Sequence, residues 1–325
     1  MPLPQSSSSH SLIYDLARIV SEGRNPDTLD IDTLSTVDVL SRINAEDAKV
    51  ATSVATQIPA IAQTVDAATR SIKAGGRLIY IGAGTSGRLG ILDAVECRPT
   101  FSVPDSLVVG IIAGGDDAIV HAVEGAEDNK AAGKDDLVAI SLTPEDTVVG
   151  ISASGRTPYV SGALTYASEL GCTTAAIACS PDAAIFEPAA IAICPVVGPE
   201  VLTGSTRMKS GTAQKMILNM ISTATMVKLG KTYENLMVDV NATNEKLKAR
   251  ACRIVMQATE CDEATAVQAL DACGNKAKVA ILMVLTNTTA EQAAQGLSDH
   301  NGYLRNAVKA NPSSELTSQP DNKTI

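Results

Sequence analysis

Apolar residues in this chain occur in short runs between residues 77 and 195, and all but one of these runs are followed by a stretch whose apolar positions have helical spacing. Short runs rich in Val and Ile, bounded by turn residues, predict buried strands. Strands that alternate with helices predict a parallel sheet that helices cover on both faces. We therefore expect an α/β fold with strands at 77–81, 107–112, 147–151, 174–178 and 190–195.

The helical spacing predicts elements before, between and after these strands. One long helix is expected at 45–73, with Asn44 as its N-cap and with Pro59 kinking or splitting it. Further helices are expected at 87–97, 117–130, 157–170 and 208–229. After Gly230 a polar connection at 234–249 leads to helices at 250–259, 262–273, 276–286 and 290–308.

The same patterns divide the chain into domains. Residues 1–43 are predicted to be an N-terminal extension that is partly disordered, because 1–11 are rich in Ser and Pro. Residues 44–233 are expected to form the α/β domain, a three-layer sandwich around the parallel sheet. Residues 234–310 are expected to form a small C-terminal all-helical domain, and 311–325 a disordered tail.

Composition narrows the class of protein. Apolar residues make up 45% of the 325 residues but aromatic residues only 2%, so Ala and Val must fill a substantial core. The net charge of −10 argues against nucleic-acid and anionic-membrane partners. Seven scattered cysteines without a CxxC pair, and three histidines, favour buried thiols in a reducing compartment over a metal site or disulfides. Without a signal peptide or a membrane-spanning apolar run, we expect a cytoplasmic protein.

The first loop with candidate chemistry is residues 82–87, GAGTSG, between a predicted strand and a predicted helix. Unpaired N–H groups and the dipole at a helix N-terminus make such a loop an anion cradle. The loop formally matches the dinucleotide pattern GxGxxG, but Thr85 and Ser86 place hydroxyls where a pyrophosphate wants bare backbone. Asp116 and Asp117, after the next strand, keep a dinucleotide site open as one alternative. A second alternative is a tight turn that binds no ligand.

Two more loops have the same character. The second loop, residues 152–159, carries Ser154, Arg156 and Thr157, and two such loops in one sheet favour phosphate binding over plain helix capping. The third loop, residues 203–212, places Arg207 and Lys209 at a helix N-terminus, where cations oppose the helix dipole. A bound anion would offset that conflict, whereas a solvated basic turn is the alternative.

Two groups of carboxylates are candidates for proton transfer. Glu96 lies in the last turn of the predicted helix 87–97, which is unfavourable for a negative charge except at the surface. In the sequence EGAED at 124–128, Gly125 inside a predicted helix costs about 1 kcal/mol relative to Ala, which indicates a close approach by another group. Glu124 and Glu127 would share a helix face, although a Glu-rich helical stretch is usually only a solvated surface. His121, one turn earlier, fits a core, capping or functional role equally well.

These motifs resemble one family in particular. LIYIGAGTSGRLGILDAVECRPTF (78–101), IIAGGDDAIVHAVEGAEDN (111–129), VVGISASGRTPYV (148–160), TGSTRMKSGTAQK (203–215) and NLMVDVNATNEKL (235–247) are similar to the N-acetylmuramic acid 6-phosphate etherases. Members of this family carry a sugar-isomerase (SIS) domain. The resemblance runs from about residue 30 to residue 308, which is far more specific than a lone GxGxxG.

The resemblance implies a SIS fold in 44–233, a homodimer, and cleavage of the D-lactyl ether of a phosphorylated sugar without a metal or another cofactor. The products would be N-acetylglucosamine 6-phosphate and D-lactate, in cell-wall amino-sugar recycling. It implies two catalytic residues, Glu96 as the acid that protonates the departing lactate and Glu127 as the base at carbon 2. The expected substrate-binding residues are Gly84, Thr85, Ser86, Gly87, Ser152, Ser154, Gly155, Arg156, Thr157, Ser205, Thr206, Arg207 and Lys209.

Two other functions remain open at this point. A sugar-phosphate isomerase of the same fold would also use a carboxylate for proton transfer at carbon 2. A sugar-phosphate-sensing regulator, similar to glucokinase regulatory protein, would use the fold without catalysis. That protein has two SIS domains, whereas this chain has one set of loops and no internal repeat.

Overall fold

The computed structural model describes residues 19–239 and 245–311. The chain divides into two compact units, of which the first comprises Met1–Val95 and Asp105–Thr223 and the second Glu96–Pro104 and Ala224–Ile325. The segments predicted to be disordered, 1–11 and all of the tail beyond Asn311, lie outside the described residues. None of the helices in the described ranges combines the length and the apolar character needed to cross a bilayer.

The first unit contains the parallel five-stranded sheet that the apolar runs predict. Its strands are β1 (Leu78–Gly82), β2 (Val108–Ile112), β3 (Thr147–Ile151), β4 (Thr173–Ile177) and β5 (Ile191–Ile193). They lie in the order β2-β1-β3-β4-β5, and every neighbouring pair is parallel. Each strand overlaps its predicted range, because a strand with both faces buried is apolar along its whole length, as β1 and β3 are.

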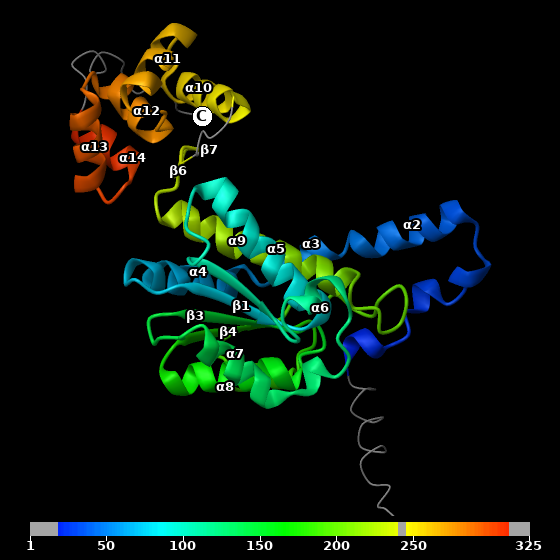
Figure 1. Ribbon diagram of the computed structural model, residues 1–325. Helices are drawn as coiled ribbons and strands as arrows, with labels where there is room; N and C mark the ends of the chain where they lie inside the picture. The colour runs from blue at the N-terminus through cyan, green and yellow to red at the C-terminus, as the bar shows by residue number, and fades with distance from the viewer. Residues whose placement is uncertain (1–18, 240–244, 312–325) are drawn as a thin grey trace, which may run out of the picture. The chain divides into compact units, whose positions relative to one another are not determined.

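Helices cover both faces of this sheet, which confirms the predicted α/β class (Figure 1). Helix α4 (Ile58–Lys73) packs against β1, β3 and β5, while α8 (Pro158–Leu170) packs on the other face against β1, β3 and β4. Helix α7 (Lys130–Ala139) lies against α8. Helix α5 (Gly84–Phe101) follows β1, and α9 (Lys209–Lys228) follows β5. Short helical elements of this unit are η1 (Val20–Glu22), η2 (Pro26–Thr28), η3 (Ile31–Thr33), α6 (Asp117–Val120), η4 (Ala126–Asp128) and η5 (Ala184–Phe186).

The helix predicted over 45–73, with a kink or split at Pro59, is confirmed only in its break near Pro59. The chain forms α2 (Thr36–Asp47), α3 (Val50–Ala55) and α4 instead. Ser35 caps α2 by accepting from the amide of Asp38, so Asn44 lies inside a helix. Pro59 falls in the first turn of α4, where its missing N–H breaks no helical hydrogen bond. The chain therefore divides into separate helices just before Pro59, which is one of the two outcomes predicted for this proline.

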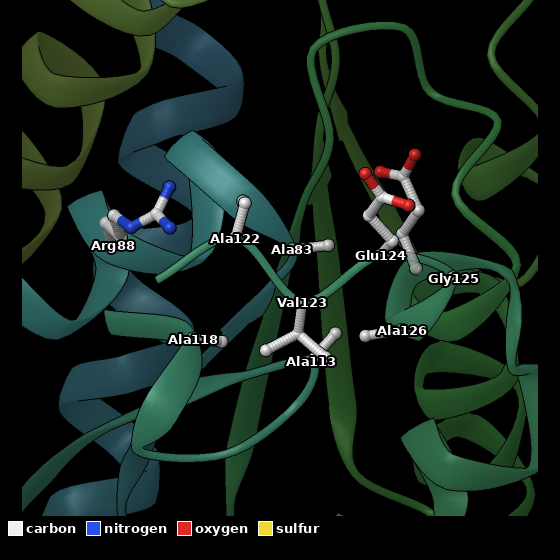
Figure 2. Close-up of a pocket in the computed structure, with 11 residues that line it drawn as sticks. Ala83, Arg88, Ala113, Ala118, Ala122, Val123, Glu124, Gly125 and Ala126 are labelled. Carbon is white, nitrogen blue, oxygen red and sulfur yellow. The ribbon is translucent and has the colours of Figure 1, made fainter. Parts of the chain in front are cut away.

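The helix predicted over 117–130 is also wrong, and this matters for the site. The segment contains the short α6 and η4 with non-helical chain between them, as Figure 2 shows at Val123 and Glu124, and α7 begins only at Lys130. Gly125 has φ of +74°, a left-handed conformation that strains any side chain. The glycine is therefore needed for a turn, and Glu124 and Glu127 do not share a helix face.

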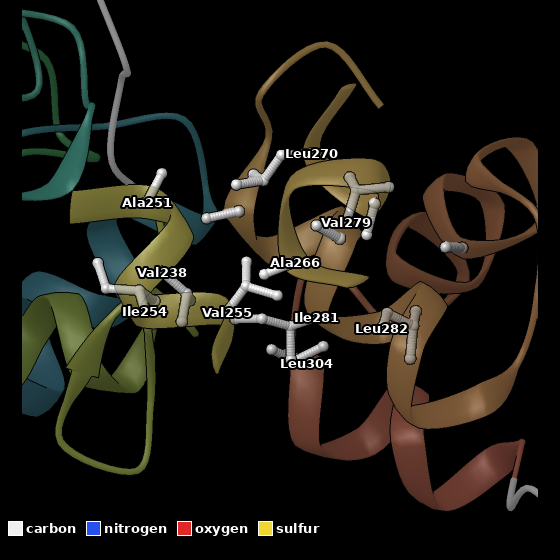
Figure 3. Close-up of a cluster of buried hydrophobic side chains, with 14 of the residues drawn as sticks. Val238, Ala251, Ile254, Val255, Ala266, Leu270, Val279, Ile281, Leu282 and Leu304 are labelled. Carbon is white, nitrogen blue, oxygen red and sulfur yellow. The ribbon is translucent and has the colours of Figure 1, made fainter. Parts of the chain in front are cut away.

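The second unit has its own apolar core. Helix α12 (Ala277–Thr286) is apolar except at Lys278 and Thr286, because α10 (Glu245–Thr259), α11 (Glu263–Ala272), α13 (Ala290–Asp299) and α14 (Leu304–Ala310) all pack against it (Figure 3). The helix predicted over 290–308 is interrupted, since Asn301 and Gly302 both have positive φ. A short antiparallel pair is formed by β6 (Thr232–Tyr233) and β7 (Leu236–Met237), of which only β7 lies within the predicted polar connection at 234–249.

Candidate active site

The sheet topology marks one point where a ligand site is expected. From β1 the chain crosses to β2 on one side, and from β3 it proceeds through β4 and β5 on the other. In open parallel sheets, ligands bind beyond the carboxyl ends of the strands at such a reversal of strand order. Gly82 of β1 pairs with Ile151 of β3, so the first and second loops start side by side there. The structure thus brings together two loops that lie about seventy residues apart, as the positions 82 and 152 show.

The first loop runs directly into α5, which begins at Gly84. A Cβ on Gly87 would lie 2.6 Å from Cγ1 of Ile112 and 2.8 Å from the carbonyl oxygen of Gly82, so only glycine lets α5 start this close to the sheet. Ser86 is buried and donates to Oε1 of Gln214 at 2.9 Å. Ser86 therefore joins the loop to α9, while the exposed Gly84 and the half-buried Thr85 are open to a ligand.

The second loop is braced by its own side chains. The hydroxyls of Ser152 and Thr157 lie 2.7 Å apart, and the amide of Gly155 donates to Oγ of Ser152 at 3.0 Å. Gly155 has φ of +75°, and a Cβ there would lie 2.1 Å from the Cβ of Ala183. Ser154 and Arg156 are half-buried, and the amide of Arg156 donates to Oγ of Ser154. The buried hydroxyls shape this loop, and Ser154 and Arg156 are the side chains that a ligand can reach.

The third loop precedes α9 and lies against the first. A Cβ on Gly211 would be 3.5 Å from the methyl carbon of Thr85, and Ser86 reaches Gln214 one turn further along α9. Ser205 and Thr206 are half-buried, and Arg207 is exposed. The three predicted loops therefore meet in one region of the first unit.

The basic start of α9 is neutralised from within the chain, which corrects the interpretation of Lys209. The buried carboxylate of Glu200 accepts from the amides of Lys209 and Ser210, both at 2.9 Å, and from Oγ of Ser210 at 2.8 Å. The Lys209 ammonium lies 2.6 Å from Oε2 of Glu46, and the two side chains are only 1% and 4% exposed. These carboxylates are the anions that the helix dipole argument required, so Lys209 is engaged without a ligand.

The pKa of Glu46 reflects this pairing. Burial raises the pKa of its carboxyl, but hydrogen bonds from Lys209 and Lys49 outweigh burial and hold the pKa below its ordinary value. Oε1 of Glu46 lies 2.5 Å from the ammonium of Lys49, which is half exposed. Glu46 is therefore ionised at neutral pH and bridges a buried lysine to a surface lysine.

A cavity of about 300 Å³ opens beside the first loop (Figure 2). Its walls come from the start of α5, the chain after β2 and the segment before α7, namely Ala83, Gly84, Arg88, Ala113, Ala118, Ala122, Val123, Glu124, Gly125, Ala126 and Glu127. The carboxylates of Glu124 and Glu127 are exposed here, and the Arg88 side chain lies across the cavity from Glu124. A cavity of this kind, with an arginine and two carboxylates over small apolar residues, fits a small polar ligand.

Arg88 is a wall residue that the sequence analysis did not single out. Its guanidinium donates to the carbonyl oxygens of Ile119 at 2.9 Å and His121 at 3.2 Å. It therefore fastens the chain after β2 to α5. The signal in the sequence was its position directly after the glycine loop, but its carbonyl partners depend on the tertiary fold.

The two predicted catalytic glutamates belong to different parts of the chain. Glu127 lines the cavity from η4, directly after Gly125. Glu96 is exposed on α5, within the stretch 96–104 that belongs to the second unit, and the cavity is lined by the first unit alone.

Asp93, one turn before Glu96 in the sequence, is a half-buried acid that the sequence analysis missed. Its Oδ1 accepts from Oγ of Ser222 at 3.1 Å, and burial raises the pKa of its carboxyl. A hydrogen bond with the buried Tyr80 works against that rise. Asp93 joins α5 to α9 and to the strand β1.

Comparisons with known proteins define the class first. Residues 60–168 match the model described as "Glucokinase regulatory protein N-terminal SIS domain", and 123–224 match "SIS domain". Together with the parallel sheet and its strand-end loops, these matches make this a SIS-domain protein.

Full-length relatives identify the family. The chain is 59% identical to an N-acetylmuramic acid 6-phosphate etherase of Pseudoalteromonas atlantica, over 92% of this chain and 97% of the relative. It is 60% identical to one of Pectobacterium atrosepticum, over 90% and 97%. Among solved structures, a phosphoheptose isomerase from Francisella tularensis matches with a TM-score of 0.46 and 18% identity, over 60% of this chain and 100% of that one. The chain belongs to the N-acetylmuramic acid 6-phosphate etherase family, which confirms the predicted resemblance.

Proposed function

We propose that this protein cleaves the D-lactyl ether of N-acetylmuramic acid 6-phosphate and releases N-acetylglucosamine 6-phosphate and D-lactate. The observation that carries this proposal is identity near 60% to etherases along almost their whole length. The role would be the recycling of cell-wall amino sugars by a carbon–oxygen lyase. The dinucleotide alternative has no comparable support, because the matches that cover the glycine loop are to SIS domains and etherases.

The phosphate and the sugar are proposed to bind where the three loops meet. Groups open to a ligand there are the start of α5 at Gly84 and Thr85, and the side chains Ser154, Arg156, Ser205, Thr206 and Arg207. The buried Ser86, Gly87, Ser152, Gly155 and Thr157 support these groups by shaping the loops. Lys209 is paired with Glu46 and supports the third loop, so we do not propose that its ammonium contacts the substrate. Local amides and arginines can hold a phosphate although the net charge of the chain is −10.

Two proton-transfer groups are needed because an ether is a poor leaving group. Opening the sugar ring gives an aldehyde that makes the hydrogen at carbon 2 mildly acidic. Glu127, at the cavity, is the proposed base that removes this proton, and Glu96 the proposed acid that protonates the lactate oxygen as its bond to carbon 3 breaks. Water then adds to carbon 3 of the unsaturated aldehyde and restores the hydroxyl.

The assembly and the location remain predictions. The family resemblance implies a homodimer, and the thiol content and charge favour the cytoplasm. The division into an extension at 1–43, a SIS domain at 44–233 and a C-terminal domain at 234–310 is likewise proposed as the functional organisation.

The test is release of D-lactate from the muramic substrate by the purified protein, measured with an enzyme-coupled lactate assay. In ¹⁸O-water, elimination followed by addition places the label on carbon 3 of the sugar and leaves the lactate unlabelled. Aldose–ketose exchange without lactate would instead establish an isomerase. The Glu96→Gln and Glu127→Gln variants should still bind N-acetylglucosamine 6-phosphate in calorimetry but lose turnover, and full turnover in either variant removes that residue from the mechanism.

A further inference from the structure

Helices α7 and α8 are in backbone contact, and glycines make this possible. A Cβ on Gly133 of α7 would lie 2.0 Å from the carbonyl oxygen of Tyr159, and a Cβ on Gly162 of α8 would lie 2.0 Å from that of Lys130. Neither position accepts any side chain without moving a helix. The distance between these two helices is therefore set by their backbones.

A hydrogen bond fixes how the two helices align. The hydroxyl of Tyr159 on α8 donates to Oδ2 of Asp136 on α7 at 2.5 Å. Tyr159 is fully buried and Asp136 is half-buried. Burial and the neighbouring Asp136 raise the pKa of Tyr159, so the hydroxyl keeps its proton and remains the donor.

Each helix begins next to one half of the candidate site. Tyr159 comes two residues after Thr157, whose hydroxyl braces the second loop. Helix α7 starts directly after η4, which carries Glu127 and packs against α8. Ala126, beside Glu127, packs against the same apolar core as Tyr159. A shift of α7 along or away from α8 would therefore move Glu127 relative to the second loop.

We propose that Tyr159 and Asp136 form a positioning pair that holds Glu127 at a fixed place relative to the phosphate-binding second loop. This inference rests on the proposed function, in which Glu127 is the base and the second loop binds substrate. Neither Tyr159 nor Asp136 lines the cavity. Their effect on the reaction is transmitted through the two helices.

The experiment compares Tyr159→Phe with Tyr166→Phe. Both changes remove one hydroxyl from α8 and keep the ring. Tyr166 is half-buried and contacts α7 through its ring, with the ammonium of Lys134 5.4 Å from the ring centre. Misplacing a reacting group by about 1 Å can cost about 100-fold in rate, so Tyr159→Phe should lower kcat for lactate release about 10- to 100-fold. KM should change less than about threefold and Tyr166→Phe should stay near wild type, because the loops themselves are intact.

Two changes at the partner complete the test. Asp136→Asn keeps an oxygen that can accept from Tyr159 and should retain near wild-type kcat, whereas Asp136→Ala should lose as much as Tyr159→Phe. The double variant Tyr159→Phe/Asp136→Ala should be no worse than either single variant, because both remove the same bond. If a thermal melt shows that Tyr159→Phe is not folded, the test compares kcat of Asp136→Ala with kcat of Asp136→Asn, because Asp136 is half-exposed.

The inference is overturned if Tyr159→Phe matches Tyr166→Phe, if it raises KM at unchanged kcat, or if Asp136→Asn is as slow as Asp136→Ala. The proposed function fails separately, when the wild-type protein itself releases no lactate. Lactate release by wild type together with unchanged kcat in Tyr159→Phe would leave the function standing and remove the positioning pair.

Discussion

The buried ion pair between Lys209 and Glu46 connects helix α2 to the start of α9, and Lys209→Met tests what it contributes. Methionine keeps most of the apolar stem of lysine and removes the ammonium. Glu46 then retains Lys49 as its remaining charged partner, at 2.5 Å. The change thus isolates the charge from the packing.

The magnitude follows from burial. Removing one partner of a buried ion pair costs about 3–5 kcal/mol because the other charge is left uncompensated. Here Lys49 still compensates part of the charge of Glu46, so we expect a loss of about 2–3 kcal/mol at pH 7. For a unit of this size that corresponds to a fall in melting temperature of about 4–12 °C.

The loss should depend on pH. The folded-state pKa of Glu46 lies below its ordinary value of 4.5, so its contribution is fully present above that value and is lost as the pH falls through the folded pKa. In Lys209→Met most of this contribution is missing at every pH. The difference in unfolding free energy between wild type and variant should therefore be full at pH 7 and shrink below about pH 4.5.

Urea unfolding at a series of pH values from 7 down to 3.5 measures this difference. Lys228→Met, an exposed lysine on the same helix, is the control and should change stability by less than about 0.5 kcal/mol. An equal loss at pH 7 and pH 3.5, or no loss at pH 7, would refute the argument that charge pairing across this contact stabilises the fold.

Three further predictions concern the site. Gly87→Ala places a Cβ 2.8 Å from a backbone oxygen of β1, so α5 must shift. Calorimetry should show at least about tenfold weaker binding of N-acetylglucosamine 6-phosphate, and unchanged binding would contradict the tight start of α5. Gly125→Ala, at φ of +74°, should cost about 1 kcal/mol in a denaturant melt and also lower kcat, whereas Gly75→Ala, with φ of +91° and open space around it, should cost similar stability at unchanged kcat. Arg88→Met releases the carbonyl oxygens of Ile119 and His121, so hydrogen exchange over 119–127 should speed up relative to the strands, and equal exchange would show that Arg88 does not hold this segment.

Much of the first unit could be predicted from local pattern. The strands were found because both of their faces are buried, so that burial is visible as runs of apolar residues. The first two loops were found because a tight strand-to-helix connection needs residues such as Gly87 and Gly155, which no larger residue can replace. Backbone conformation and short-range burial leave a signature within a few residues of their cause.

Contacts between distant segments decided the rest. The sequence showed cations at the start of α9, but Glu46, the partner of Lys209, lies 163 positions away and was not predicted. The apolar residues over 117–130 have helical spacing, yet no continuous helix forms there. The left-handed turn at Gly125 interrupts the segment, and α7 packs on α8 only after that turn. Propensity and periodicity weigh neighbours within a turn or two, whereas ion pairs, backbone contacts and cavities depend on which surfaces meet once the sheet has formed. The sequence by itself therefore determined the class of fold and the chemistry available, and the tertiary structure decided which of those groups face a ligand and which hold the others in place.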